Sequence, residues 1–457
     1  MATSRNNVGA LITAACGTFL RDTSCPSWWA DYQTTKGTRV HKGNLVKSAN
    51  LLALAACVLF CGMAAAQSKN TCLDCHTNLP APFGVTADTF SQDIHAQKGL
   101  TCASCHGGDP TSDDPRVAMS KKSGWKGKID HKQVPELCGH CHSDPAYMRQ
   151  YDPSLRTDQL SEYKTSVHGK RLAMGDMKVA VCTDCHSVHD LRAPNDLQSK
   201  VNPVNVATTC AHCHADAEYM KSYKIPTDQF AEYSTSVHHD ALMVRGDSSA
   251  PTCSTCHGNH GAAPPGVESV ANVCSNCHVF QAQLFASSPH KQAFTSAGLP
   301  GCVTCHSNHA IVHPTDEFVG TGEKAVCTQC HTQGDEGYAI AGQIKEKLGQ
   351  LSSSIDKANQ ILGTAERSGM EVSEAKLDLA QAKDALTKAR VTLHTADLTK
   401  VEADLKPGFD SAGKDYNAGK HALAERDYRR VGLALSLVAI GLVIVGLRLY
   451  IRQIERG

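Results

Sequence analysis

The sequence predicts a mainly α-helical chain with little sheet, which ends in an antiparallel three-helix bundle whose last helix continues into a C-terminal transmembrane helix. Three observations predict this class. A Cys-x-x-Cys-His motif occurs nine times between Cys72 and His331. Beyond Gly334 the apolar residues follow a heptad spacing, and the run from Val431 to Leu447 contains no charged residue. The formal net charge is zero, so the composition gives no sign of a nucleic-acid partner.

The nine motifs carry the attachment signature of c-type haem. Two thiols add to the two vinyl groups of one porphyrin, and the adjacent histidine is carried under the ring, where its imidazole binds the iron. The attachment cysteines are Cys72, Cys75, Cys102, Cys105, Cys138, Cys141, Cys182, Cys185, Cys210, Cys213, Cys253, Cys256, Cys274, Cys277, Cys302, Cys305, Cys327 and Cys330. The motif histidines are His76, His106, His142, His186, His214, His257, His278, His306 and His331. The sequence therefore predicts nine covalently bound haem c groups.

Zinc sites and disulfides are the alternative uses of so many cysteines. Zinc sites combine two Cys-x-x-Cys pairs, or one pair with a spaced histidine pair. Disulfide bridges have no use for a trailing histidine. Here a histidine directly follows the second cysteine in all nine motifs, and 18 of the 22 cysteines lie in motifs. We therefore favour haem attachment. At about 29 residues per haem, we expect stacked porphyrins wrapped by short helices and loops.

The haem region contains an internal repeat. Residues 138–194 run in parallel with residues 210–264, and both contain Thr-Ser-Val-His between their two motifs. A shorter copy follows these two, a degenerate copy precedes them, and a ninth motif stands alone at Cys327. The repeating unit is a pair of motifs with a histidine between them, and repeats of this kind usually stack. The histidines between paired motifs are His95, His168, His238 and His290.

Iron in an electron-transfer haem is usually held from both faces, so nine haems need nine further axial ligands. We predict the four histidines between paired motifs as ligands, together with three that lie three residues after a motif histidine, because these positions recur. Two linker histidines ahead of a motif complete the set. The predicted distal ligands are His95, His168, His189, His238, His260, His290, His309, His131 and His313. A surface or propionate-binding role is the alternative for each of them.

The N-terminal part has the pattern of a secreted precursor. Residues 40–66 combine a basic start, an apolar run of 13 residues and three alanines at the end, which is typical of a signal peptide. Residues 1–39 fit no signal pattern, and we interpret them as a misassigned extension, with translation starting at Val40. Lipoprotein processing at Cys57 is the alternative to signal peptidase cleavage. Either route exports the haem domain, residues 67–333.

Residues 334–430 are predicted to form a helical bundle, because Cys, Pro and aromatic residues nearly vanish and apolar residues repeat at intervals of three and four. The predicted helices cover about 338–366, 371–404 and 410–455. Ser368-Gly369 and Pro407-Gly408 are expected to form the turns. His394 and His421 are expected to face solvent, with a quinone or haem contact as the alternative.

Residues 431–451 are predicted to span the membrane, since 17 uncharged residues meet the lower length limit for a membrane helix. Arginines flank both ends, so the positive-inside rule does not choose the orientation. Haem c is attached outside the cytoplasm, which predicts a periplasmic haem domain at a bacterial inner membrane and a cytoplasmic tail at residues 452–457. A buried core helix is the alternative.

The paired motifs, the Thr-Ser-Val-His between them and the Cys-His-x-x-His after them resemble the multihaem cytochromes c with doubled haem-binding motifs. This superfamily includes cytochrome c3-like proteins, membrane-bound quinol-oxidising tetrahaem cytochromes and cytochrome c554-like proteins. The resemblance covers residues 72–331. It implies that the histidine between paired motifs is a distal ligand. The anchor differs, because quinol-oxidising members carry it at the N-terminus and this chain carries it at the C-terminus.

These features predict a membrane-anchored periplasmic electron carrier, with no catalytic residue. It would pass electrons in anaerobic respiration from a quinol-linked donor or respiratory membrane complex to a periplasmic redox protein. The first alternative is a multihaem reductase of nitrite, hydroxylamine or a similar small substrate, which needs one open haem. The 12 histidines of the haem region that lie outside its motifs argue against an open iron. The second alternative is a scaffold subunit that docks through the bundle.

Overall fold

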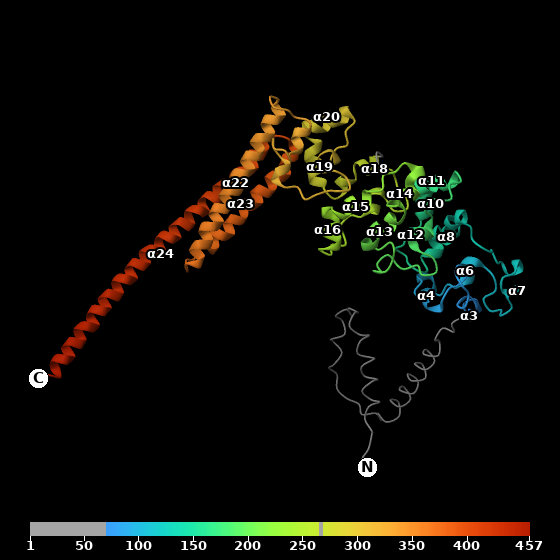
Figure 1. The fold of residues 1–457 in the computed structure, drawn as a ribbon, viewed down its shortest axis with the longest axis horizontal. Coiled ribbons are helices and arrows are strands. Elements are labelled where there is room, and N and C mark those ends of the chain that lie inside the picture. Colours follow the sequence, from blue (N-terminus) through green and yellow to red (C-terminus); the bar gives the residue numbers. More distant parts are fainter. Residues whose placement is uncertain (1–69, 265–267) are drawn as a thin grey trace, which may run out of the picture. The chain divides into compact units, whose positions relative to one another are not determined.

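The computed structural model describes residues 70–264 and 268–457. Within these two ranges all regular elements are helices, and no strand occurs. Short helices up to residue 329 are followed by three long helices between residues 336 and 454 (Figure 1). The predicted mainly α class is therefore confirmed. The predicted extension at 1–39 and signal peptide at 40–66 lie outside the described residues.

The attachment motifs are wound on single helical turns. Seven motifs lie at the ends of α3 (Thr71–His76), α6 (Cys102–His106), α8 (Val134–His142), α12 (Cys182–His186), α13 (Pro203–His214), α17 (Cys253–His257) and α21 (Val303–His306). The motifs that begin at Cys274 and Cys327 lie on the 3₁₀ turns η4 (Val273–Asn276) and η6 (Val326–Gln329). A helical turn places residues three apart on one side, so both cysteines of a motif can reach the same porphyrin.

Each histidine between paired motifs is the second residue of a short helix. These helices are α5 (Ile94–Gln97), α11 (Val167–Ala173), α16 (Val237–Met243) and α20 (Pro289–Ala297). Each begins after a buried N-cap residue, namely Asp93, Ser166, Ser236 or Ser288. The Ser166 hydroxyl accepts the Gly169 N–H at 2.9 Å, and the Asp93 carboxylate accepts the His95 N–H at 2.8 Å. The cap fixes the first residue of the helix and therefore the direction of the histidine.

The remaining helices of the haem region are short connectors. One precedes each capped helix: α4 (Ala87–Ser91), α10 (Gln159–Thr165), α15 (Gln229–Ser234) and α19 (Val279–Ala286). The others are α7 (Pro115–Ala118), α9 (Pro145–Met148), α14 (Ala217–Met220), α18 (Glu268–Ala271), η1 (Lys121–Ser123), η2 (His131–Gln133), η3 (Lys221–Tyr223) and η5 (Asp316–Phe318). Buried apolar side chains form only small clusters among the described residues here, such as the one around Leu172 and Val181. Among the described residues, protein side chains alone therefore form no extended apolar core in this region.

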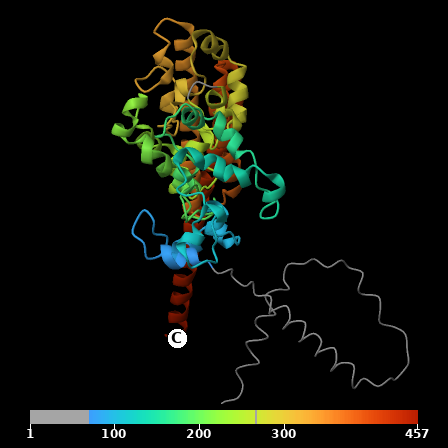
Figure 2. The same cartoon turned by 90° about the vertical axis from the view of Figure 1, so that its right-hand side faces the viewer.

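The bundle has a continuous apolar core. It consists of α22 (Glu336–Arg367), α23 (Ser373–Thr392), η7 (Leu393–Thr395) and the first part of α24 (Leu398–Ile454) (Figure 1, Figure 2). The predicted seam on the first helix is buried, and Leu348, Leu351 and Leu362 are fully enclosed against Leu379 and Leu405. Burying such side chains contributes about 1.5–3 kcal/mol each. The predicted three-helix bundle is confirmed.

One of the two predicted turns is wrong. Ser368-Gly369 does end α22, and Gly369 has φ +80°. The next reversal lies at residues 393–397, where Ala396 has φ 52° and Asp397 caps α24. Pro407-Gly408 lies inside α24. A Cβ on Gly408 would come within 2.8 Å of Leu351 Cδ2, so this glycine allows close helix packing rather than chain reversal.

α24 continues far beyond the bundle core as a single helix to the C-terminal end of the chain (Figure 1). Its length and apolar composition make it a candidate membrane span. None of its most apolar 18-residue window is buried within the protein. Val431, Leu435 and Leu442 are exposed by 61–69%. A buried core helix is therefore excluded as an account of this segment.

Candidate functional site

The cysteines of the described residues are arranged for attachment rather than for metal binding by thiolates. None of the 18 motif cysteines forms a disulfide within the described residues. Within residues 70–264 and 268–457, no group of three or more His, Cys, Asp and Glu side chains could hold a metal ion. A structural zinc site needs four such ligands around one ion, so the arrangement of the described residues favours haem attachment over zinc.

The two motifs of each repeat unit lie side by side. Their first cysteines lie close enough to perturb each other in all four units: Cys72–Cys102, Cys138–Cys182, Cys210–Cys253 and Cys274–Cys302. Motif cysteines of successive units also lie near one another: Cys105–Cys141, Cys185–Cys213, Cys256–Cys274 and Cys305–Cys327. The attachment points therefore form one continuous row from the first motif to the ninth.

Eight of the nine motif histidines face a second histidine, with ring centroids 5.9–6.4 Å apart. The pairs, motif histidine first, are His142–His95, His106–His189, His214–His168, His186–His260, His278–His238, His257–His309, His331–His290 and His306–His394. An imidazole nitrogen lies about 2.0 Å from a bound metal ion and the ring centroid about 1.1 Å further, so two rings on opposite sides of one ion have centroids about 6.2 Å apart. The spacing fits one haem iron between each pair.

The pairs join consecutive units. The histidine between the motifs of one unit faces the first motif histidine of the next, as His168 of the second unit faces His214 of the third. The histidine that trails the second motif faces the second motif histidine of the preceding unit, as His260 faces His186. Every pair within the repeat therefore takes one histidine from each of two neighbouring units, so that no unit completes a site alone.

Backbone hydrogen bonds hold this register. The residue before the histidine between the motifs donates its N–H to the residue two positions beyond the trailing histidine of the next unit. The bonds are Ile94 to Leu191 at 2.7 Å, Val167 to Ala262 at 3.1 Å and Val237 to Ile311 at 2.8 Å. In the fourth unit this position is Pro289, which has no N–H to donate. The proline stands where the succession of units ends and the ninth motif and the bundle follow.

Burial favours the neutral form of several paired imidazoles, and neutral imidazole is the form that binds a metal. Burial, with a smaller contribution from the neighbouring His260, lowers the pKa of His186 to about 4. Burial likewise lowers the pKa of His142, His168 and His214.

Several Nδ1 atoms of the paired histidines are hydrogen-bonded, which leaves Nε2 free for iron. His95 Nδ1 lies 3.1 Å from Asp93 Oδ1, and His331 Nδ1 lies 3.2 Å from Asp335 Oδ1. His394 Nδ1 donates to the Val391 carbonyl at 2.8 Å. Such outer contacts fix the tautomer and the ring orientation of a ligand.

The two predicted linker ligands do not join a motif histidine in the described part of the chain. His131 directs Nε2 to the Val179 carbonyl at 2.8 Å, and His313 directs Nδ1 to the Pro314 carbonyl at 3.1 Å. His131 begins η2 and His313 lies in the loop after α21, so neither has the buried cap that aims the histidines between motifs. A position in a linker ahead of a motif was therefore not enough to predict that a histidine side chain points toward a motif histidine.

His394, which we expected to face solvent, instead faces His306 from the bundle. It lies on η7, at the chain reversal that we expected further along the chain, at Pro407-Gly408. The sequence does contain a signal for His394, because the last repeat unit lacks the following unit that would supply its partner histidine. The second motif of the fourth unit is followed by no fifth unit to supply a trailing histidine, so its partner had to come from elsewhere.

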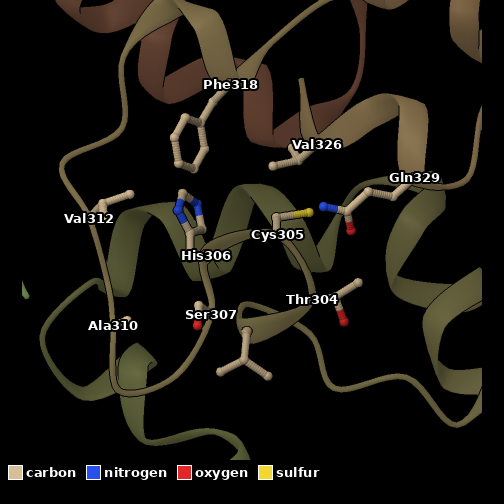
Figure 3. A pocket seen from close by; sticks show the side chains of 10 residues that line it. Thr304, Cys305, His306, Ser307, Ala310, Val312, Phe318, Val326 and Gln329 are labelled. Carbon is tan, nitrogen blue, oxygen red and sulfur yellow. The ribbon is translucent and has the colours of Figure 1, made fainter. Parts of the chain in front are cut away.

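Open space adjoins the motif side chains, as haem attachment requires. A cavity of about 390 Å³ lies beside His306 and Cys305 and is bounded by Phe318, Val326 and Gln329. Figure 3 shows the Phe318 ring facing His306, with Cys305 pointing toward Gln329. A second cavity of about 370 Å³ adjoins Cys256 and His257. The donor set, the spacing of the paired rings and these cavities all fit haem c.

Residues 94–215 match the family model described as cytochrome c3. The matched segment contains four of the motifs, those that begin at Cys102, Cys138, Cys182 and Cys210. The comparison with curated proteins found no match, and neither did the comparison with solved structures.

Proposed function

We propose that the chain is a nonahaem electron carrier anchored in a membrane, because residues 94–215 match the cytochrome c3 family model. The family binds haem c covalently and transfers electrons. The continuous row of attachment points is the observation that extends this assignment from residues 94–215 to the whole haem region. The same contacts between neighbouring motifs recur from Cys72 to Cys327.

In this function each group of side chains has its own role. The 18 motif cysteines form thioether links, and the nine motif histidines bind iron from one face. Haem iron, when bound, takes up and releases single electrons. The second face is assigned to the partners in the ring pairs: His95, His168, His189, His238, His260, His290, His309 and His394.

The chain's own contribution is to fix positions. The inter-unit hydrogen bonds set the distance between neighbouring sites, and the hydrogen bonds to Nδ1 hold the ligand rings in one orientation. A carboxylate such as Asp93 or Asp335 also raises the basicity of the imidazole that it contacts, which favours the oxidised iron. The nearness of successive attachment sites supports electron passage along the row in either direction.

The bundle separates the haem region from the membrane segment. This separation favours a partner protein, rather than a quinol within the bilayer, as the electron donor. We place residues 431–451 in a bacterial inner membrane, the haem domain in the periplasm and the C-terminus in the cytoplasm. α24 runs about 50 Å from Leu398 to Arg430 at about 1.5 Å per residue, between the haem region and the apolar run. A quinol-linked respiratory complex that projects into the periplasm could reach across this spacing, and a soluble periplasmic redox protein could accept the electrons.

Protease accessibility and haem staining in spheroplasts test this proposal together. Added protease should cleave the haem region in intact spheroplasts, and the haem-stained band should fractionate with the inner membrane. The haems should be reduced when a quinol-linked substrate is supplied to the membranes. A haem-stained chain that resists protease until the membrane is disrupted would contradict the orientation.

A further inference from the structure

His76 is the motif histidine without a ring partner among residues 70–264 and 268–457. The other eight each face a histidine at 5.9–6.4 Å. The register of the units accounts for this difference. A first motif histidine is faced by the histidine between the motifs of the preceding unit, and the described residues contain no unit before the one that holds His76. His76 therefore lacks a partner because the described residues contain no earlier unit to supply one.

The remaining histidines of the described residues do not fill this position. His131 is bound through Nε2 to the Val179 carbonyl, and His239 packs edge-on against Tyr233 at 5.5 Å. His140 and His212 lie inside motif helices α8 and α13. His313 contacts the Pro314 carbonyl, and His421 is exposed on the bundle.

His76 is otherwise prepared like the paired ligands. Its Nδ1 donates to the Phe83 carbonyl at 2.9 Å, so Nε2 is free for iron. Cys72 contacts Cys102, so a haem held here lies in the same row as the others. The surroundings are open, because Phe83 is 65% exposed and Leu79 is 44% exposed. Among the described residues, therefore, nothing encloses this end of the row.

We propose that the haem attached through Cys72 and Cys75 has one exchangeable axial position, which binds small exogenous ligands of iron such as diatomic gases. This inference rests on the proposed function, since it requires haem at the first motif. It makes the first haem different in kind from the other eight. Electrons arriving along the row can there meet a ligand bound directly to iron, whereas the histidine pairs protect the other irons.

Carbon monoxide is the probe that tests this inference. The covalent haem content of the purified full-length chain is first counted by the pyridine haemochrome method, and the dithionite-reduced protein is then titrated with carbon monoxide. We expect nine haems and one carbon monoxide bound per chain, with one high-spin ferric signal in the oxidised protein. Nine haems that are all low-spin and bind no carbon monoxide would overturn the inference and leave the proposed function intact. Far fewer than nine haems would instead overturn the proposed function.

Two matched double variants locate the site. Cys72→Ala with Cys75→Ala should give eight haems and no carbon monoxide uptake. Cys327→Ala with Cys330→Ala also removes one haem, from the opposite end of the row, and should still bind one carbon monoxide per chain. Uptake that persists in the first double variant would show that another haem is the open one.

Discussion

The imidazole of His306 faces that of His394, with ring centroids 6.1 Å apart and ring planes inclined by 23°. His306 ends a motif helix, and His394 lies between two long helices of the bundle. Arg390, one turn before His394, forms two hydrogen bonds of 2.8 Å with Asp316 on the haem side of the junction. The bundle therefore occupies the place of a fifth repeat unit and supplies the histidine that such a unit would contribute.

Replacing His394 should open the site of His306. In His394→Ala the iron at this motif would lose its second histidine, so carbon monoxide uptake by the reduced protein should rise by one per chain over the unaltered protein. His421→Ala is the matched control, because His421 is exposed on the same bundle and faces no motif histidine in the described residues. Equal uptake in the two variants would show that His394 is not a ligand.

The two kinds of predicted distal histidine should behave differently. His168→Ala removes the ring that faces His214 at 6.2 Å and should add one high-spin haem and one carbon monoxide per chain. His131→Ala should leave both quantities unchanged, because His131 binds the Val179 carbonyl through Nε2. A new high-spin signal in His131→Ala, detected by electron paramagnetic resonance, would refute this distinction.

The sequence predicted those parts of the site whose histidines recur at equivalent positions of the repeat units. The seven histidines at repeated positions all lie in ring pairs, because capped helices and trailing segments return in every unit. Their partners could not be predicted, since each pair forms between units that stack in space. His394 and His131 occur once each, so the sequence offered no second copy to show which of them is aimed at a motif. The helical class followed from motif density and heptads, but Pro407-Gly408 looked like a turn because packing against Leu351 is invisible in the sequence.

The bundle should depend on its buried seam. Leu348→Ala leaves a cavity in a fully enclosed position and should lower the free energy of unfolding by about 2–5 kcal/mol. Leu377→Ala is the control on the same bundle, because Leu377 is 74% exposed and its loss should cost less than about 0.5 kcal/mol. Urea unfolding followed by circular dichroism measures both. Similar losses in the two variants would contradict the core described above.

Asp415 should make the bundle less stable as the pH rises. Its carboxyl is buried, contacts Ser411 Oγ at 3.3 Å, and has its pKa raised above the usual 3.8 by burial, with Asp378 adding to the shift and Lys414 opposing it. A group with a raised folded-state pKa stabilises the fold at low pH, and that contribution is lost as pH rises through the folded pKa. The stability gain in Asp415→Asn should therefore increase from pH 4 to neutrality. A gain that is constant over a urea series at several pH values would disprove this role.

Removing residues 431–457 should release the protein from the membrane without changing its haem content. The deleted part of α24 contains the apolar window that no described residue covers, so the bundle core stays intact. Fractionation and haem staining of the truncated chain measure the effect. Retention of the shortened chain in the membrane fraction would mean that another segment anchors it.

The number of haems per chain tests the central claim most directly. Intact-mass spectrometry of the purified mature protein, combined with metal analysis, should show nine haem c groups and nine irons on one polypeptide. A mass that corresponds to far fewer haems, or zinc in place of iron, would contradict the row of nine attachment sites on which the pairing of the histidines depends.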